Sequence, residues 1–451
     1  MAVMMRYWLY ATTRVLEMRK PEEERTTRHS DLLKHSQYWP KEIMTNYQQS
    51  KLRALLVHAY QEVPHYHAMF KSLDLKPDNI KNASDLRKLR FLDKSTIKGS
   101  LANLTADNLR KKAIPSSTGG STGVPLKFYT DWQMWSWGGA ARDRAWEWAG
   151  YELGDKCALL LASPRDISAS KSLSSKIVSL VLRRLAFDSF QMSDKELGRF
   201  AGEMARFKPR VIRASPTSGF LFARYVAEHD IRSIEPKSII TASENLFPHQ
   251  RKLIEETFRC PVYDWYGSRE TSLVAHECEE RCGYHISDEN SIVEFIKDGE
   301  PVSPGESGEI VITDLNNYVM PWIRYRIEDM GTPTEERCNC GRHLSMMSKI
   351  DGRTTDYFLT RSGRRLPGPL LTLIFKDVEN VRQFQLVQRR MDSIVVKVVR
   401  ENAFTERDAK TLIDIVKRYV GDDVDVSIEY MERIDPAKSG KRRFIISEVK
   451  E

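Results

Sequence analysis

The spacing of apolar residues predicts helices in the first part of the chain. Residues 30–100 have a helical character, and within them Leu52, Leu55 and Leu56 recur near helical spacing. Pro64 ends this run, because proline cannot continue a helix interior. The first 110 or so residues therefore predict a helical N-terminal segment that leads into a larger domain.

Short apolar runs alternate with helical patterns through the middle of the chain. The predicted strands are 157–162, 211–212, 238–241 and 262–265, the predicted helices are 132–148, 193–207 and one starting at Pro248, and 163–175 is a predicted loop. Ser193 with Glu196 has the spacing of a capping box, which supports the second helix. Strands that alternate with helices predict an α/β layer with a mainly parallel sheet.

Beyond residue 290 the pattern changes to short strands separated by glycine and proline turns. These predicted strands are 292–296, 308–313 and 324–327, and after a break at 351–353 come strands at 384–387, 393–399 and 424–430 with a helix at 406–419. We therefore predict a large N-terminal domain, residues 1–350, with a β-rich portion, and a small α+β C-terminal domain, residues 351–451.

Composition describes a globular protein with a modest positive charge. The 451 residues are 41% hydrophobic and 29% charged, with a net charge of +8. The densest basic clusters, 361–365 and 438–443, are short, so we expect that the protein does not bind nucleic acid. A modest positive charge suits small ligands that carry phosphate groups. No apolar run reaches the length of a transmembrane span, and the N-terminus lacks the features of a secretory signal. These observations favour a cytoplasmic protein.

A loop rich in glycine and hydroxyl side chains precedes the tryptophan-rich helix. Residues 116–127 have the sequence Ser-Ser-Thr-Gly-Gly-Ser-Thr-Gly-Val-Pro-Leu-Lys. Glycine lets the backbone approach a ligand closely, and N–H groups and hydroxyls donate to an anion with several oxygens, such as a triphosphate. A flexible linker has a similar composition, but the apolar residues that follow indicate that this loop opens onto structure.

Further motifs follow the glycine loop in a definite order. They are Thr241-Ala-Ser243-Glu244-Asn245, Asp264-Trp-Tyr266-Gly267-Ser268-Arg269-Glu270, Tyr325-Arg326-Ile327-Glu328-Asp329, Gly352-Arg353-x-x-Asp356 and Ser439-Gly440-Lys441. This order and spacing resemble the adenylate-forming (acyl-AMP) ligase superfamily, and within it the phenylacetate–CoA ligase and CapK-like branch. The resemblance covers essentially the whole chain, and several motifs in order are far more specific than any one of them.

The resemblance implies a nucleotide site assembled from several motifs. The implied ATP- and AMP-binding residues are Ser117, Thr118, Gly119, Gly120, Ser121, Thr122, Gly123, Ser243, Glu244, Asn245, Tyr266, Gly267 and Asp329. In this reading the glycine loop holds the β- and γ-phosphates, Tyr266 offers a flat ring to adenine, and Asp329 accepts hydrogen bonds from the ribose hydroxyls.

Three residues are implied to act on the reaction itself. Glu270 offers a carboxylate oxygen to Mg²⁺ beside the triphosphate, and Arg353 assists near the ribose or the α-phosphate. Lys441 reaches from the small domain to the substrate carboxylate and the α-phosphate, where it offsets the charge of the transition state. Taken singly, each residue has a simpler structural explanation, such as a salt bridge or a solvated side chain, so the interpretation depends on their joint occurrence.

The chain departs from the usual pattern of this superfamily at four places. Lys127 comes one place later than the usual lysine, Ser243 replaces a more usual glycine, Ile327-Glu328 replaces Thr-Gly before Asp329, and Thr355 stands where many relatives carry a hinge Asp or Lys. These differences are compatible with nucleotide binding, but they put the second half-reaction in question.

Four of the six cysteines form two close pairs. The pairs are Cys278-x3-Cys282 and Cys338-x-Cys340, with His276, His285 and His343 near them. In a chain expected to be cytoplasmic, such pairs indicate a metal more than disulfides, and tetrahedral zinc takes four thiolates or three with an imidazole. We predict that the four cysteines bind a structural zinc ion, which would connect the segment after Glu270 to the segment after Asp329. Four reduced cysteines without a ligand role are the alternative.

The function implied by the resemblance is that of an AMP-forming acid ligase. Such an enzyme converts ATP and an aryl or acyl carboxylic acid into acyl-AMP and pyrophosphate, and then transfers the acyl group, with CoA as the implied acceptor. Two alternatives stay open: transfer to an amine or a sugar in surface-polysaccharide or natural-product biosynthesis, and a non-catalytic CapK-like assembly protein. The sequence identifies neither the acid nor the oligomeric state, which leaves a homodimer open.

The acid is expected to bind beside the tryptophan-rich helix. Its surroundings would be Trp135, Trp137 and Arg142 on that helix, residues 214–220, and residues 267–271. Aromatic side chains suit an aryl or acyl group, and a core role for the tryptophans is the alternative.

Overall fold

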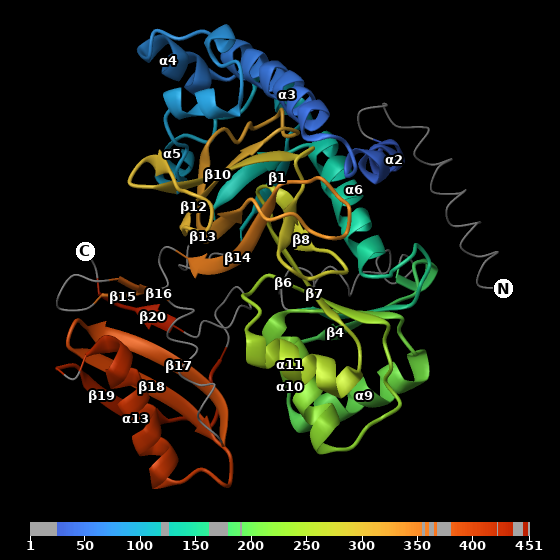
Figure 1. Ribbon diagram of the computed structural model, residues 1–451, viewed down its shortest axis with the longest axis vertical. Coiled ribbons are helices and arrows are strands. Elements are labelled where there is room, and N and C mark those ends of the chain that lie inside the picture. Colours follow the sequence, from blue (N-terminus) through green and yellow to red (C-terminus); the bar gives the residue numbers. More distant parts are fainter. Residues whose placement is uncertain are drawn as a thin grey trace.

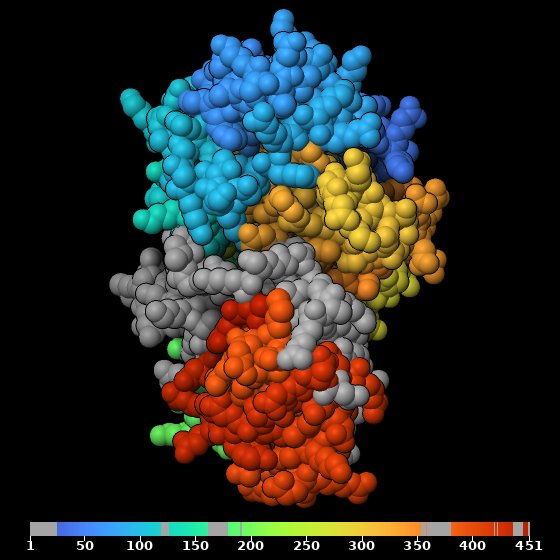
Figure 2. Space-filling view, turned by 90° about the vertical axis from the view of Figure 1, so that its left-hand side faces the viewer, coloured from blue at the N-terminus to red at the C-terminus, as the bar shows by residue number. Residues whose placement is uncertain are grey.

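The computed structural model of this protein has a large lobe and a small lobe (Figure 1). It describes residues 25–118, 126–161, 179–189, 192–353, 357–359, 365–367, 380–421, 423–435 and 445–449. Each lobe has apolar clusters of its own, since no cluster combines residues of the two lobes among those described. In the space-filling view the N-terminal helices and the small lobe lie at opposite ends of the molecule (Figure 2). The predicted loop at 163–175 falls within residues 162–178, outside the described part.

Helices form the N-terminal segment, as predicted. They are α2 (Thr26–Ser36), α3 (Lys41–Glu62), α4 (Pro64–Ser72) and α5 (Lys94–Gly99), with short 3-10 turns at Pro77–Asn79, Ala83–Lys88 and Asp107–Lys112. Leu52, Leu55 and Leu56 are buried in the largest apolar cluster of the large lobe. Pro64 follows the end of α3 and occupies the first position of α4, where its missing N–H costs nothing.

One mixed sheet of twelve strands runs through the large lobe. Its strands are β3 (Cys157–Leu161), β4 (Arg184–Asp188), β5 (Val211–Ala214), β6 (Ser238–Ala242), β7 (Val262–Ser268), β8 (Ser272–Glu277), β9 (Tyr284–Ile286), β10 (Ser291–Lys297), β11 (Glu300–Pro301), β12 (Gly308–Asp314), β13 (Tyr325–Thr334) and β14 (Met346–Arg353). They lie in the order β11-β10-β12-β13-β14-β9-β8-β7-β6-β5-β3-β4.

The two halves of this sheet have different strand directions. The five strands from β4 to β7 are parallel, which confirms the parallel layer predicted for the middle of the chain. The strands from β8 to β14 pair antiparallel and form the predicted β-rich portion. The sequence pattern did not indicate that β7 and β8 join both halves into one sheet.

Helices cover both faces of the parallel half. On one face lies α6 (Trp132–Trp148), and on the other lie α9 (Asp194–Phe207), α10 (Pro216–Glu228) and α11 (Pro248–Phe258). The Asp131 carboxylate accepts from the Met134 N–H at 2.7 Å and so caps α6. Arg144 of α6 forms a buried ion pair of 2.8 Å with Glu289, which ties this helix to the turn before β10.

Two smaller sheets and a hairpin complete the fold. The hairpin of β1 (Ile114–Ser117) and β2 (Lys127–Thr130) belongs to the large lobe. In the small lobe β15 (Tyr357–Leu359) pairs with β16 (Arg365–Pro367), and a four-stranded sheet has the order β19-β18-β17-β20. Its elements are β17 (Val381–Arg390), β18 (Ser393–Arg400), α13 (Glu406–Val420), β19 (Asp425–Tyr430) and β20 (Ile445–Ser447). This is the predicted small α+β unit, and the boundary near residue 350 stays a prediction.

Ion pairs connect the two lobes where the small lobe faces α9 and α10 (Figure 1). The Arg224 guanidinium of α10 lies 3.2 Å from the Glu401 carboxylate and also donates to the carbonyl oxygen of Arg382 at 3.4 Å. Arg382 in turn pairs with Asp194 of α9 at 2.9 Å. These contacts hold the lobes in one relative orientation. None of the described helices is long and apolar enough to cross a membrane.

Candidate functional site

Several of the implied nucleotide-binding residues lie at one edge of the parallel half-sheet. Ser243, Glu244 and Asn245 come directly after β6, while Tyr266 and Gly267 stand near the end of the neighbouring strand β7. The carboxyl ends of parallel strands meet at the same edge, which is where open α/β sheets bind ligands. This edge is the candidate site.

A hydrogen bond joins two of the implied residues across the sheet. The Tyr266 hydroxyl donates to the Asp329 carboxylate at 2.9 Å, although the two residues are 63 positions apart. Asp329 stands in the middle of β13, and its register partner on β14 is Arg353, whose backbone alone is described. The residue Tyr266 is only 7% exposed, so most of its ring is covered by neighbouring side chains. Its hydroxyl is held by Asp329.

Glu270 lies in the turn between β7 and β8 and is almost completely buried. Its carboxylate is 5% exposed and accepts from the Tyr325 hydroxyl at 3.2 Å, while its N–H donates to the Ser268 hydroxyl. Burial, with the adjacent Glu270 carboxylate, raises the pKa of Tyr325 far above its usual value, which keeps the phenol protonated as the donor. No basic side chain pairs with Glu270 in the described part of the chain.

The turn that carries Glu270 requires glycine at its start. A Cβ on Gly267 would lie 2.2 Å from the carbonyl oxygen of Ser272, a distance that no real side chain tolerates. The neighbouring helix α6 is also close, since a Cβ on Gly138 would lie 2.0 Å from the Ser272 hydroxyl. Backbone packing therefore fixes the position of Glu270.

Two of the departures from the superfamily pattern occupy left-handed backbone positions. Ser243 has a φ of +78° and Glu328 a φ of +70°, a conformation that favours glycine because it has no Cβ. A glycine would adopt this conformation without strain at either place. Here the Glu328 carboxylate pairs with Lys94 of α5 at 2.6 Å, and Lys94 also donates to the carbonyl of Ile327, so an ion pair holds the unusual turn before Asp329.

The 243–245 turn is held against the start of a helix. The Glu244 carboxylate accepts from the Thr217 N–H of α10 at 3.2 Å. An anionic side chain at a helix N-terminus is favoured, because free N–H groups and the helix dipole both attract it. This contact positions the segment that the superfamily resemblance assigns to the edge of adenine.

The glycine loop itself lies outside the described residues, but both of its ends are described. Ser117 of β1 pairs with Lys127 of β2, and Thr118 exchanges hydrogen bonds of 3.0 Å with Leu126. The two described ends of the loop therefore lie side by side at the end of a hairpin. Gly119, Gly120, Ser121, Thr122 and Gly123 fall outside the described residues, as do Thr355, Asp356, Ser439, Gly440 and Lys441.

The residues expected beside the acid have mostly structural contacts. Trp137 is buried and stacks on His29 with 3.9 Å between ring centroids, which makes it core between α6 and α2. Trp135 is 51% exposed and donates to the Thr130 hydroxyl. Arg142 lies on the exposed side of α6 beside Asp143. Trp137 is therefore a core residue, which is the alternative role considered for the tryptophans.

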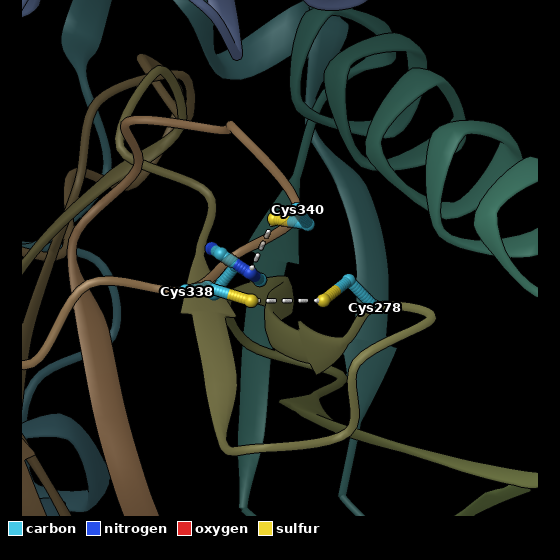
Figure 3. A group of neighbouring side chains, drawn as sticks. Cys278, Cys338 and Cys340 are labelled. Carbon is cyan, nitrogen blue, oxygen red and sulfur yellow. Dashed lines mark hydrogen bonds between the residues drawn. The ribbon is translucent and has the colours of Figure 1, made fainter.

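The four cysteines of the two pairs lie together, although 56 residues separate the pairs. Figure 3 shows three of them, Cys278, Cys338 and Cys340. The Cys338 sulfur is 3.4 Å from that of Cys278 and 3.3 Å from that of Cys282. The Cys340 sulfur lies 3.4 Å from Nε2 of His285. We call these five residues the cysteine cluster. The contact between the Cys278 and Cys338 sulfurs, short but without a disulfide, is what two ligands of a shared metal ion produce.

Four members of the cluster have ligand atoms within 4.8 Å of one another: Cys278, His285, Cys338 and Cys340. The mutual set therefore contains His285 in place of Cys282, which the sequence had included among the zinc ligands. Burial and nearby guanidinium groups lower the pKa of His285 to about 4, so its imidazole is neutral at pH 7, the form that binds a metal. Three thiolates and one imidazole make a common zinc ligand set.

The cluster connects two hairpins that also carry the candidate site. Cys278 follows β8, whose hairpin with β7 contains Tyr266 and Glu270. Cys338 and Cys340 lie between β13 and β14, the strands of Asp329 and Arg353. The Tyr266–Asp329 hydrogen bond joins the same two hairpins. A metal ion in the cluster would hold the two hairpins together at a second place.

Sequence reasoning missed three residues that shape this site. Tyr325 was inside a quoted motif but was given no role, although it is the partner of Glu270. His285 was one of three nearby histidines, and nothing in its spacing distinguished it. Lys94 gives no signal in the sequence, because its partner Glu328 is 234 residues away.

The chain is similar to known proteins over most of its length. It is 26% identical to a phenylacetate–coenzyme A ligase of Thermus thermophilus over 403 residues, 84% of this chain and 86% of that protein. It is also 26% identical to the protein CapK of Staphylococcus aureus, over 78% of this chain and 80% of CapK. A family model described as the CapK C-terminal domain matches residues 358–448. These findings confirm the resemblance stated from the motifs.

Solved structures of adenylate-forming ligases have the same fold. A 2-hydroxyisobutyryl-CoA ligase in its postadenylation state, in complex with an acyl-AMP, superposes with a TM-score of 0.75 at 19% identity and covers 92% of this chain and 93% of that one. The same ligase with CoA in its thioesterification state gives a TM-score of 0.61 at 18% identity, with 91% of each chain covered. The α/β fold with a separate small domain, predicted from the sequence, is confirmed.

Proposed function

We propose that this protein activates a carboxylic acid with ATP, forming acyl-AMP and pyrophosphate, and then transfers the acyl group to CoA. The observation that carries the proposal is the Tyr266–Asp329 hydrogen bond beside the buried Glu270, since it brings three motif residues from distant parts of the chain to one sheet edge. The phenylacetate–CoA ligase relatives and the shared fold support the same reaction. Phenylacetate itself is not implied, because no motif identifies the acid.

The contacts suggest how the nucleotide would be held. Tyr266 fixes the Asp329 carboxylate by donating to one of its oxygens, so that Asp329 can accept from the ribose hydroxyls. Glu244, anchored at the start of α10, orients the backbone of residues 243–245 toward adenine. The hairpin of β1 and β2 presents the glycine loop, whose N–H groups and hydroxyls would bind the β- and γ-phosphates.

The environment of Glu270 fits a magnesium ion. This carboxylate is buried and has a hydroxyl but no basic side chain beside it in the described residues, and a buried charge without a counter-ion is costly. A divalent cation would supply that counter-charge, and carboxylate oxygens are its preferred ligands. Mg²⁺ bound there would neutralise part of the triphosphate charge.

The cysteine cluster fits a structural zinc ion. Cys278, His285, Cys338 and Cys340 would be its ligands, in place of the four cysteines predicted from the sequence. All four ligands come from protein side chains, and a zinc site without an open position is structural. The six free cysteines also suit a reducing compartment such as the cytoplasm.

One specific observation favours a different acceptor, an amine or a sugar. The small lobe matches the CapK C-terminal domain, and that lobe is the part that would present the adenylate to its acceptor. Transfer to an amine or a sugar is therefore the alternative to transfer to CoA. Acid activation comes first in both cases.

Acid-dependent exchange between pyrophosphate and ATP, measured across a library of carboxylic acids, tests the proposal. We expect exchange with at least one acid, and we expect Lys441→Ala to slow it by about 100-fold or more, because a donor to the transition-state charge is lost. Lys438→Ala is the matched control, since it removes a lysine three residues away, and it should retain the exchange rate.

The outcomes separate the alternatives. AMP release that depends on CoA supports transfer to CoA, whereas exchange without any CoA-dependent release supports an amine or a sugar as acceptor. ATP binding without exchange for any acid would contradict acid activation and favour the non-catalytic role. Unchanged exchange in Lys441→Ala would remove this lysine from the mechanism.

A further inference from the structure

We propose that Cys282 and Cys338 form a reversible disulfide when the protein meets a hydroperoxide, and that this disulfide releases the metal ion from the cysteine cluster. The inference rests on the zinc site proposed above, but it concerns the one cysteine of the cluster that the ion does not need. It adds an oxidant-sensitive site to an enzyme of acid activation.

The cluster holds one ligand more than zinc requires. Zinc in structural sites is four-coordinate, and Cys278, His285, Cys338 and Cys340 already provide four mutually close ligand atoms. Cys282 is outside this set, yet its sulfur lies 3.3 Å from the Cys338 sulfur. A disulfide needs about 2.05 Å between sulfurs, so only a small approach of the two side chains is required.

Exposure selects Cys282 as the site of attack. It is the only exposed cysteine among the six, all of which are in described segments, whereas Cys278 is 0% and Cys338 7% exposed. A hydroperoxide in solvent therefore reaches Cys282 first, and Cys338 is the thiol next to it. Cys157 and Cys260 are buried and do not belong to the cluster.

The backbone around Cys282 is fixed by its neighbours. The Arg281 N–H closes a turn onto the carbonyl of Cys278, and the Arg281 side chain pairs with Glu255 of α11. A Cβ on Gly283 would lie 2.9 Å from the carbonyl oxygen of Met347, so the segment lies tightly against β14. Cys282 is thus held at the edge of the cluster, which favours reaction with one particular partner.

The chemistry balances with a hydroperoxide as the oxidant. The Cys282 thiol loses its proton, and the thiolate attacks the peroxide, which gives a sulfenic acid and hydroxide; the hydroxide takes up the proton, so hydrogen peroxide yields one water. The Cys338 thiolate then attacks the sulfenic sulfur, the S–S bond forms and hydroxide leaves. Two electrons pass from the two sulfurs to the peroxide. The ion loses the Cys338 thiolate as a ligand and is held by Cys278, Cys340 and His285 alone.

Loss of that thiolate weakens the site at its centre, since Cys338 is the sulfur that contacts both Cys278 and Cys282. The disulfide would keep the turn after β8 linked to the loop between β13 and β14, because it crosses the same 56 residues. The two hairpins thus stay connected while the ion leaves. A thiol reductant would restore the original ligand.

The test uses full-length, zinc-loaded protein treated with hydrogen peroxide. Released zinc is followed with a metallochromic dye, and disulfides are mapped by peptide mass spectrometry after alkylation. We expect release of the bound ion together with a Cys282–Cys338 linkage, reversed by dithiothreitol. Cys282→Ser should bind zinc in the same ratio to protein but release it at least about tenfold more slowly, because the first thiol to be oxidised is gone. Cys260→Ser is the matched control and should behave as the wild type.

Several results would overturn the inference. A Cys282→Ser protein that is folded by circular dichroism but does not bind zinc would make Cys282 a ligand. A linkage between Cys278 and Cys338, or release from Cys282→Ser at the wild-type rate, would also overturn it. If the wild-type protein binds no zinc, the proposed metal site is wrong. In that case the absence of a Cys282–Cys338 disulfide after peroxide treatment would also refute the proposed disulfide. Loss of pyrophosphate exchange bears on the proposed function and leaves these readouts unaffected.

Discussion

At the scale of residues, the candidate site is defined by a few polar contacts between distant segments. The Tyr266 hydroxyl and the Asp329 carboxylate meet at 2.9 Å, and the Tyr325 hydroxyl meets Glu270 at 3.2 Å. In both pairs a tyrosine donates to a carboxylate that the proposed function assigns to the nucleotide or its metal ion. The tyrosines therefore act as positioning residues that set the direction of each carboxylate.

Removing one hydroxyl tests this positioning role. In Tyr266→Phe we expect the KM for ATP to rise roughly tenfold, because Asp329 loses a hydrogen bond to a charged acceptor, which is worth about 1.5–3 kcal/mol. The KM for the acid should stay the same. Tyr263→Phe on the same strand is the control, and steady-state kinetics with each substrate varied separately provide the measurement. Equal changes in both KM values would indicate general damage to the fold.

Residue-scale features differ in how far the sequence could predict them. The motif order predicted that Tyr266, Glu270 and Asp329 belong to one site, and the structure brings them to one region. The positions of Ser243 and Glu328 favour glycine because their φ angles are positive. Such backbone angles cannot be derived from a single sequence. The glycine loop and Lys441 lie outside the described residues, so their roles stay predictions.

At the scale of elements, two hairpins carry the site, and the cysteine cluster joins them. The β7–β8 hairpin supplies Glu270, the β13–β14 pair supplies Asp329, and Cys278 with Cys338 connects their far ends. Element positions were predictable where a local signal marked their ends. Helix α6 has the predicted bounds, and it begins at Trp132 because Asp131 caps its N-terminus. The continuation of β13 to Thr334 and the joining of both half-sheets depend on pairing between distant strands, which local patterns do not encode.

Removal of the metal ion tests the connection between the hairpins. We expect dialysis against a chelator to lower the midpoint of thermal unfolding of the large lobe by roughly 5–10 °C, because an ion at 1,000 times its dissociation constant stabilises the native state by about 4 kcal/mol. Differential scanning calorimetry before dialysis, after it, and after zinc is restored provides the measurement. Cys340→Ser should show the lower midpoint and no response to the chelator, whereas Cys260→Ser, which lies outside the cluster, should respond to the chelator as the wild type does. A midpoint that does not respond to chelation in zinc-loaded protein would contradict a structural role for the ion.

At the scale of the whole molecule, the arrangement of the lobes matters most. Ion pairs between the lobes are part of the arrangement seen here. If the small lobe must turn before the acyl group is transferred, the Arg224–Glu401 pair has to break. The pair then favours the arrangement seen here over the turned one.

Charge exchange between the lobes tests this balance. Arg224→Glu should slow acid-dependent pyrophosphate exchange by about two- to fivefold, since a partly exposed ion pair is worth at most about 1 kcal/mol. The double variant Arg224→Glu with Glu401→Arg should recover most of the rate because opposite charges face each other again. Arg232→Glu disrupts a pair within the large lobe and is the control. If the exchange rate of the double variant falls by as much as the effects of the two single substitutions added together, the pair does not act between the lobes.

The strand at one margin of the large sheet has a consequence for solubility. A long sheet with an open margin is a template on which another chain can add a strand, and the usual defences are short length, proline and charge. Strand β11 combines all three, since it consists of Glu300 and Pro301 alone and both side chains are exposed. Proline has no N–H to offer an incoming strand. Where β11 pairs with the last two residues of β10, the sheet margin therefore offers little to an incoming strand, although β10 is rich in isoleucine, valine and phenylalanine.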